Sequence, residues 1–267
     1  MRLRILCLLA LCFALLCGCT EAETSAPLPD LSPVTNAVAE FNSADPRYTA
    51  FTLNVSEAGK GKEESLFFTQ GTASYRKGAP VAMSGRMTQI QKGVGSSANM
   101  YYKAGAYYRD SGESKYYLIM DRDAFLKQFI CTDVLLFAEG EVTSAHTATT
   151  GAGTKYTLSL GADTAALNGI FGDTLFNNCG LRKARRDKVV YDKVQYTYVV
   201  STEGKLVSFA VNASATLYDT PAYYPNYSVD EESLKHSFDI SFELTVKATG
   251  NSVVIEVPKT EDFVFIE

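Results

Sequence analysis

The sequence is poor in the residues that most often carry catalysis and metal binding. It has no tryptophan, two histidines and six cysteines in 267 residues. It contains no Gly-x-Ser-x-Gly, no His-Glu-x-x-His and no phosphate-binding loop. There is no Cys-x-x-Cys, and His146 and His236 have no ligand spacing around them, so no metal site is predicted. No cofactor is expected, and the chain is predicted not to be an enzyme.

Long hydrophobic runs are also scarce, and the one that exists is at the N-terminus. Residues 5–16 are apolar but too few for a stable bilayer-spanning helix, which needs roughly 20 residues. Two arginines precede this run, and the Leu-Cys-Gly-Cys that ends at Cys19 resembles the bacterial lipobox. We therefore expect residues 1–18 to be a signal peptide and Cys19 to be diacylated. The alternative is an ordinary secretory signal with a later cut, near Ala22 or Ala26.

Positive charge is scarce in the chain that follows the expected cleavage. It carries 23 Lys and Arg against 30 Asp and Glu, so nucleic acid is not an expected partner. Residues 19–33 are the lipidated cysteine and a polar, proline-rich tether. The predicted location is the outer face of the bacterial cell membrane, which two acyl chains suffice to hold.

Only two cysteines remain once the signal peptide and the anchor are set aside. Cys131 and Cys179 are an even pair in a protein expected to be exported, which permits one disulfide. Both lie in apolar sequence surroundings, so two buried free thiols are the alternative.

Alternation of apolar and polar residues predicts a protein made mainly of β-strands. Residues 238–247 put five apolar side chains on one face, which is the pattern of a strand with one wet side. Residues 205–217 alternate in the same way and follow 189–200 across a turn, which predicts a hairpin. A second hairpin is predicted at Gly250-Asn251, with a last strand over 253–257. Further strands are expected at 48–55, 66–75, 81–90, 98–102, 106–109, 115–120, 141–146 and 155–160.

Helical spacing of apolar residues interrupts the strands at 121–137 and 163–176, and a short helix is predicted at 34–41. Asp121 is the N-cap candidate of the first long helix. A large sheet of long strands tends to curl, and its apolar face needs a cover. The predicted fold is therefore mainly β (α+β): a curved antiparallel sheet, or half-open β-barrel, with two or three helices packed on the concave face. One domain is expected over residues 34–267.

The order of these features resembles a known family. The aromatic hairpin of residues 100–109, the Tyr-rich strand at 116–121, the helix after it and the strand pair around 201–205 carry the resemblance. Together with the lipobox they look like the lipoproteins that share a half-barrel fold with the carrier LolA and the mycobacterial LppX group. Lipoproteins of Gram-positive gut bacteria are similar in the same way.

The resemblance implies a concave apolar surface that binds or carries a lipid or another hydrophobic ligand without enzymatic activity. The residues expected to line it are Phe125, Phe129, Phe209, Val211, Phe238, Ile240 and Phe242. The alternative reading of the same residues is a filled core, in which case the protein is a surface interaction or sensing module with an unknown protein partner.

A basic segment stands out in this acidic chain and is a candidate patch for an anionic surface. Its residues are Arg182, Lys183, Arg185, Arg186 and Lys188. The alternative is a solvated loop that leads into the strand at 189–200.

Overall fold

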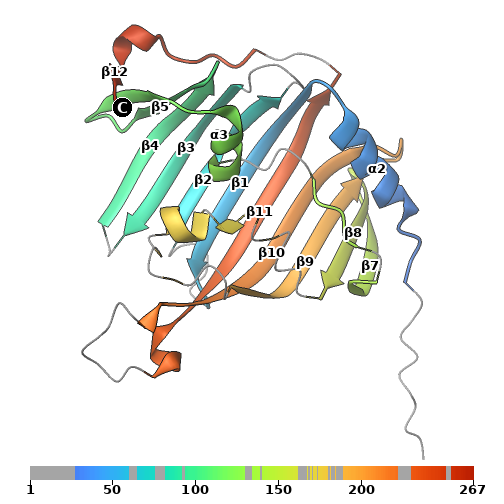
Figure 1. The fold of residues 1–267 in the computed structure, drawn as a ribbon. Coiled ribbons are helices and arrows are strands. Elements are labelled where there is room, and N and C mark those ends of the chain that lie inside the picture. The colour runs from blue at the N-terminus through green and yellow to red at the C-terminus, as the bar shows by residue number, and fades with distance from the viewer. Residues whose placement is uncertain are drawn as a thin grey trace, which may run out of the picture.

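The structure is a computed structural model in which an open, strongly curved sheet forms most of the molecule (Figure 1). It describes residues 28–59, 65–75, 82–91, 94–129, 134–138, 140–161, 167, 169, 171–172, 174–179, 181, 184, 189–221, 230–250 and 254–267.

The described strands form a single sheet in the order β12-β6-β5-β4-β3-β2-β1-β11-β10-β9-β8-β7. All neighbours are antiparallel except β12 and β6, which are parallel. The sheet does not close on itself, so the predicted half-open barrel is confirmed. The strands are β1 (Arg47–Glu57), β2 (Ser65–Tyr75), β3 (Ala82–Gln91), β4 (Val94–Lys103), β5 (Ala106–Asp110), β6 (Lys115–Ile119), β7 (Val142–Thr150), β8 (Gly153–Leu160), β9 (Val190–Val200), β10 (Leu206–Tyr218), β11 (Lys235–Thr249) and β12 (Val264–Phe265).

Helical segments lie on the concave side of this sheet, as the sequence predicts (Figure 1). Helix α2 (Ser32–Ser43) begins with a proline in its first turn and buries four apolar side chains, including Phe41. Helix α3 (Arg122–Phe129) lies over the other half of the sheet. The described residues of 167–178 are also helical and end in the π-helical turn η2 (Thr174–Asn178). Short 3-10 turns are η5 (Glu231–Leu234) and η6 (Thr260–Asp262).

Strand alternation explains why the concave side holds the core. In β11, the apolar residues from Phe238 to Leu244 are buried at every second position, and the residues between them face outward. Because β11 is bonded to β1 on one side and β10 on the other, it lies in the middle of the sheet. The strand with the clearest sequence pattern is therefore also a central one.

The predicted hairpin at Gly250 is wrong. Residues 254–259 are not a strand, although Ile255 and Val257 alternate with polar residues. Both edges of β11 are already occupied by β1 and β10, so no edge is left for a hairpin partner. The chain instead crosses to the far end of the sheet, where β12 pairs with β6 (Figure 1). There, Phe263 packs on Tyr108, with ring centroids 5.3 Å apart, on the outer side of the sheet.

The predicted helix over 121–137 is too long. Helix α3 ends at Phe129, and residues 134–138 are irregular. The amide side chain of Asn42 in α2 explains the change, because its Nδ2 donates to the Val134 carbonyl and its Oδ1 accepts from the Val134 N–H, each at 2.9 Å. These two bonds satisfy the backbone N–H and carbonyl groups of Val134 without a helix.

A pair of glycines allows close contact between two strands in the bent sheet. Gly71 in β2 and Gly85 in β3 are directly opposite each other. A methyl group on Gly71 would lie 2.5 Å from the Ser84 carbonyl oxygen and 3.2 Å from the Phe51 ring. No other residue type fits there without a shift of the backbone.

Candidate functional site

The residues predicted to line a ligand cavity are buried in the protein core. Phe125 and Phe209 are fully buried, and the remaining described members are at most 3 % exposed. All belong to one continuous hydrophobic cluster, together with residues of α2, β1 and β9. The side chain of Phe129 lies outside the described residues. The described members are Phe125, Phe209, Val211, Phe238, Ile240 and Phe242.

The helical segment 167–178 fills the centre of the concave side. Leu167, Phe171 and Leu175 are fully buried. The Phe171 ring meets the Phe242 ring of β11 edge-on, with centroids 6.2 Å apart, and Phe242 in turn meets Phe209 of β10 at 6.4 Å. These distances and angles are typical of aromatic pairs in a packed interior. The apolar face of the sheet is therefore covered by the protein's own side chains here.

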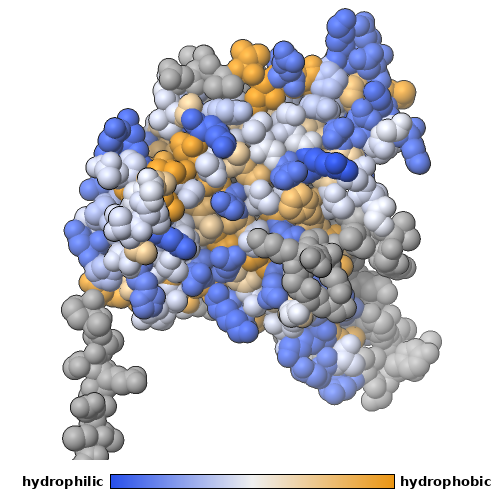
Figure 2. Space-filling view, turned by 180° about the vertical axis from the view of Figure 1, so that it is seen from behind, coloured by the Kyte–Doolittle hydropathy of each residue, from blue (hydrophilic) through white to orange (hydrophobic). Residues whose placement is uncertain are grey.

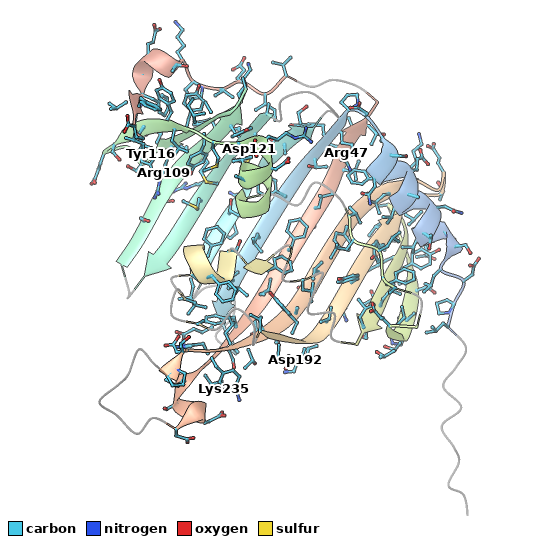
Figure 3. The ribbon with its side chains drawn as sticks, in the orientation of Figure 1. Arg47, Arg109, Tyr116, Asp121, Asp192 and Lys235 are labelled. Atoms are coloured by element: carbon cyan, nitrogen blue, oxygen red, sulfur yellow. The ribbon has the colours of Figure 1, made fainter. Side chains whose placement is uncertain are left out.

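Helix α3 covers the other half of the concave side. Phe125 stacks on Tyr102 of β4 with ring centroids 4.0 Å apart and planes 11° apart. Asp121, as predicted, caps the helix, because its Oδ1 accepts from the Asp123 N–H at 2.8 Å (Figure 3). The Tyr107 ring lies beside the Phe125 ring, and burial raises the pKa of the Tyr107 hydroxyl, so this side chain stays neutral.

Residues 134–138 close the side of the core next to β9. The Tyr198 hydroxyl donates to the Leu135 carbonyl at 2.6 Å, and burial raises the pKa of that hydroxyl. The rings of Tyr198 and Phe137 have centroids 6.3 Å apart. On the other side of α2, the Arg47 guanidinium lies over the Phe41 ring at 5.2 Å (Figure 3).

An open hollow of about 600 Å³ lies at the rim of the barrel, where α2 begins and β7 starts. We call it the rim hollow. Apolar side chains from two distant parts of the chain line it, and Leu28 among them is 49 % exposed. Hydrogen bonds from the side chain and backbone of Ser32 lower the pKa of Asp30, so this carboxylate is charged at neutral pH. Its lining residues are Leu28, Pro29, Asp30, Leu31, Ser32, Thr35, Asn36, Phe137, Gly140 and Val142.

The sequence did not point to the rim hollow. Leu28 and Leu31 were assigned to the tether, and Phe137 to a helix. In the structure Leu31 packs on the core next to α2, and Phe137 and Val142 reach the same place from the other side. Only the two leucines in a proline-rich stretch could have signalled it.

The structure describes only some of the remaining predicted site residues. Cys179 packs on the core, and burial raises the pKa of its thiol to about 12. Cys131 lies outside the described residues, so the disulfide stays a prediction. Cys19 also lies outside them, as does the whole basic segment Arg182, Lys183, Arg185, Arg186 and Lys188.

One ionisable pair was not expected from the sequence. His236 in β11 places its Nε2 3.4 Å from Oδ2 of Asp219, which directly follows β10. Within the described residues, no group of three His, Cys, Asp or Glu side chains is arranged to hold a metal ion. Nor does that part of the chain include a helix long and apolar enough to cross a membrane.

No protein-family model matches the chain, and no curated protein matches it by sequence. Among solved structures, it is similar to the crystal structure of LprF from Mycobacterium bovis, with 11% identity and a TM-score of 0.46 over 88% of this chain and 99% of that one. It is also similar to a LolA superfamily protein from Nitrosomonas europaea (8% identity, 83% and 95% covered, TM-score 0.25).

A third similar structure is a domain of a putative outer membrane lipoprotein-sorting protein from Vibrio parahaemolyticus (9% identity, 84% and 93% covered, TM-score 0.20).

Proposed function

We propose that the protein is a non-enzymatic lipoprotein, anchored through Cys19 at the outer face of the membrane, that binds a hydrophobic or amphipathic ligand in the rim hollow. The observation that carries this proposal is the hollow itself. Its volume of about 600 Å³ is within the range of small-molecule sites, and Leu28, Leu31, Phe137 and Val142 give it an apolar wall. We do not place the ligand at the concave centre of the sheet, because buried side chains fill that space.

The position of the rim hollow suits a ligand taken from the membrane. Leu28 follows Cys19 by nine residues, so a lipid anchor would hold the hollow at most ~30 Å from the bilayer surface. The Asp30 carboxylate beside the apolar wall would face the polar end of such a ligand. An amphipathic molecule with one acyl chain fits this combination of groups.

Native mass spectrometry with organic extraction tests the proposal directly. Residues 20–267, produced without the anchor cysteine and purified from cells without detergent, are expected to carry an apolar adduct in a defined ratio. Leu28→Asp is the sharpest variant, because this side chain lines the hollow and is already 49 % exposed. The change should leave the fold intact and lower binding of a fluorescent monoacylglycerol analogue, whose uncharged hydroxyls can donate to the Asp30 carboxylate. Val254→Asp, at a side chain that is 83 % exposed elsewhere, is the matched control.

The filled core favours a second candidate, a surface interaction module with no ligand. All described residues of the predicted cavity are buried in one cluster, as this alternative requires. A clean mass without adduct, together with equal monoacylglycerol titrations for the parent chain and Leu28→Asp, would support the module and contradict the binder.

A further inference from the structure

The outer face of the sheet carries a continuous row of uncharged polar side chains around one aromatic ring. Six neighbouring strands each contribute one residue to this row, and each residue lies directly opposite the one on the next strand. In sheet order, the strands are β10, β11, β1, β2, β3 and β4. At ~4.8 Å between strands the row is about 24 Å long. We call it the outer polar row. Its members are Asn212, Ser241, Asn54, Phe68, Thr88 and Ser97. Asn54 is only 5 % exposed, so the accessible polar groups of the row are those of the other members.

The row lies on the face opposite the helices. Val55 and Phe67, the neighbours of Asn54 and Phe68 in sequence, are buried in the core, so Asn54 and Phe68 point the other way. Figure 2 looks onto this outer face, where side chains of intermediate hydropathy lie between charged groups and scattered apolar patches. Phe68 is half-buried there, with polar residues next to it on both neighbouring strands.

Two open hollows lie at the two ends of the row. One, of about 320 Å³, is lined by Asn54, Asn212 and Ser241 of the row and by Lys193 and Asp239 beside it. Lys193 is an extra residue in β9, where the register with β10 shifts, and its φ of 49° is rare for a residue with a side chain. Such bulges re-aim side chains and are frequent next to binding sites.

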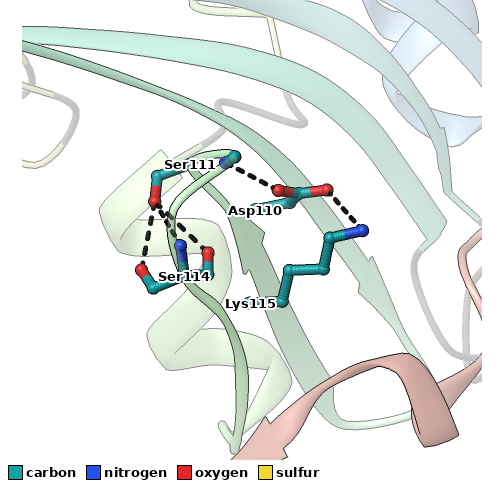
Figure 4. Close-up of polar contacts among 5 residues, drawn as sticks. Asp110, Ser111, Ser114 and Lys115 are labelled. Atoms are coloured by element: carbon teal, nitrogen blue, oxygen red, sulfur yellow. Dashed lines mark hydrogen bonds and ion pairs between the residues drawn. The ribbon is translucent and has the colours of Figure 1, made fainter.

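The other hollow, of about 340 Å³, includes Ser97 of the row together with Arg86 and the start of the β5–β6 turn. A hydrogen bond and an ion pair to Asp110 stabilise this turn (Figure 4). The Gly112 N–H donates to Oδ1 of Asp110 at 2.8 Å, and Lys115 Nζ lies 3.3 Å from the other carboxylate oxygen. Phe68 therefore lies in the register between the two hollows.

Hydrogen bonds hold the polar groups around the row in place. The Arg86 Nε–H donates to the Ser97 hydroxyl at 3.0 Å, and the Thr88 hydroxyl lies 3.0 Å from the same oxygen. At the other end, Ser214 Oγ donates to Oδ1 of Asp239, and the Gly59 N–H donates to Oδ2, each at 3.0 Å. Side chains positioned in this way lose little entropy when they bind.

We propose that the outer polar row binds an extended, uncharged saccharide chain that crosses the strands, with one sugar ring on Phe68. The apolar C–H face of a pyranose can pack on the negative face of an aromatic ring, and its hydroxyls can bond to amides and hydroxyls that both donate and accept. The row itself carries no formal charge. Lys193 and Arg86 in the hollows are each accompanied by an aspartate, so an anionic polymer is a poorer match.

Titration of the mature chain, released from membranes in mild detergent, with cellohexaose, hexa-N-acetylchitohexaose and heparin tests the proposal. At least one of the two neutral hexamers is expected to bind, and heparin is not. Phe68→Ala should weaken hexamer binding about tenfold, which corresponds to about 1.4 kcal/mol. Phe68→Tyr keeps the ring and should keep binding. Asn212→Ala, at an exposed residue of the row, should weaken binding with an unchanged melting temperature.

Phe265→Ala is the matched control, because it removes an exposed aromatic ring from β12, away from the row. If Phe68→Ala does not fold, Asn212→Ala decides the result. The proposal is wrong if neither hexamer binds at millimolar concentration, if only heparin binds, or if the folded variants of the row bind as well as the parent chain. None of these results depends on the rim hollow, because Leu28 and the row are on different parts of the molecule.

Discussion

The replacement Phe171→Ala tests whether the concave side is filled. Phe171 has no exposed surface and contacts Phe242 from the helical segment that covers the sheet. Truncation of a buried phenylalanine removes apolar burial and leaves a cavity, which costs about 3–5 kcal/mol. For a domain of about 240 residues, each kcal/mol lowers the melting temperature by about 2–4 °C, so a fall of about 6–20 °C is expected.

Urea unfolding and calorimetry measure this loss. The slope of the free energy of unfolding against urea should be unchanged, because the same surface is exposed when either chain unfolds. Val254→Ala, at a side chain that is 83 % exposed, should change stability by less than about 0.5 kcal/mol. A loss below about 1 kcal/mol for Phe171→Ala would refute the filled core, and the concave side would then be a candidate ligand site.

Three further predictions concern buried groups. Tyr198→Phe should cost about 1–3 kcal/mol in urea unfolding, because the Leu135 carbonyl loses the hydroxyl that lies 2.6 Å away. Gly71→Ala should lower the melting temperature by several degrees, since the new methyl would lie 2.5 Å from the Ser84 carbonyl. Cys179, with a pKa raised to about 12, should react with iodoacetamide at pH 8.5 about a thousandfold more slowly in the folded than in the urea-unfolded chain.

Each of these has its own control. Gly151→Ala adds a methyl where no atom lies within 4 Å and should leave the melting temperature nearly unchanged. The thiol is followed in a Cys131→Ser chain, so that only one unmodified cysteine reacts. Because the folded-state pKa of Cys179 is raised, its protonated form is favoured in the fold, and stability falls as pH rises through the unfolded value near 8.5. Rapid alkylation of the folded chain would show that this thiol is accessible.

Much of the fold could be predicted because long strands with one wet face alternate with period two. The alternation in 238–247 identifies β11 and its buried face, and the spacing of Leu167, Phe171 and Leu175 identifies a helix that covers the sheet. The last hairpin could not be predicted, because local alternation at 253–257 does not reveal that both edges of β11 are occupied. The irregular backbone at 134–138 could not be predicted either, because Val134 bonds to Asn42, a residue 92 positions earlier in sequence.

The candidate sites were less predictable than the fold. Residues such as Phe209 and Phe242 read equally well as cavity wall or as filled core, because both need apolar side chains at alternate positions. The rim hollow joins Leu28 to Val142, and the outer polar row joins Asn54 to Ser97 through the register of intervening strands. A one-residue change of strand register would move the side chains of the row to the other face of the sheet.

By itself, the sequence determined the export and lipidation expected at Cys19, the mainly β character and the apolar face of the sheet, because each depends on residues close together in the chain. The tertiary structure decided whether that face is open or filled, which strand lies in the middle of the sheet and which polar residues come together. Those outcomes depend on contacts between segments far apart in sequence, such as Phe171 on Phe242 and Tyr198 on Leu135. Local pattern shows which side chains must be buried, and only the packed chain shows what buries them.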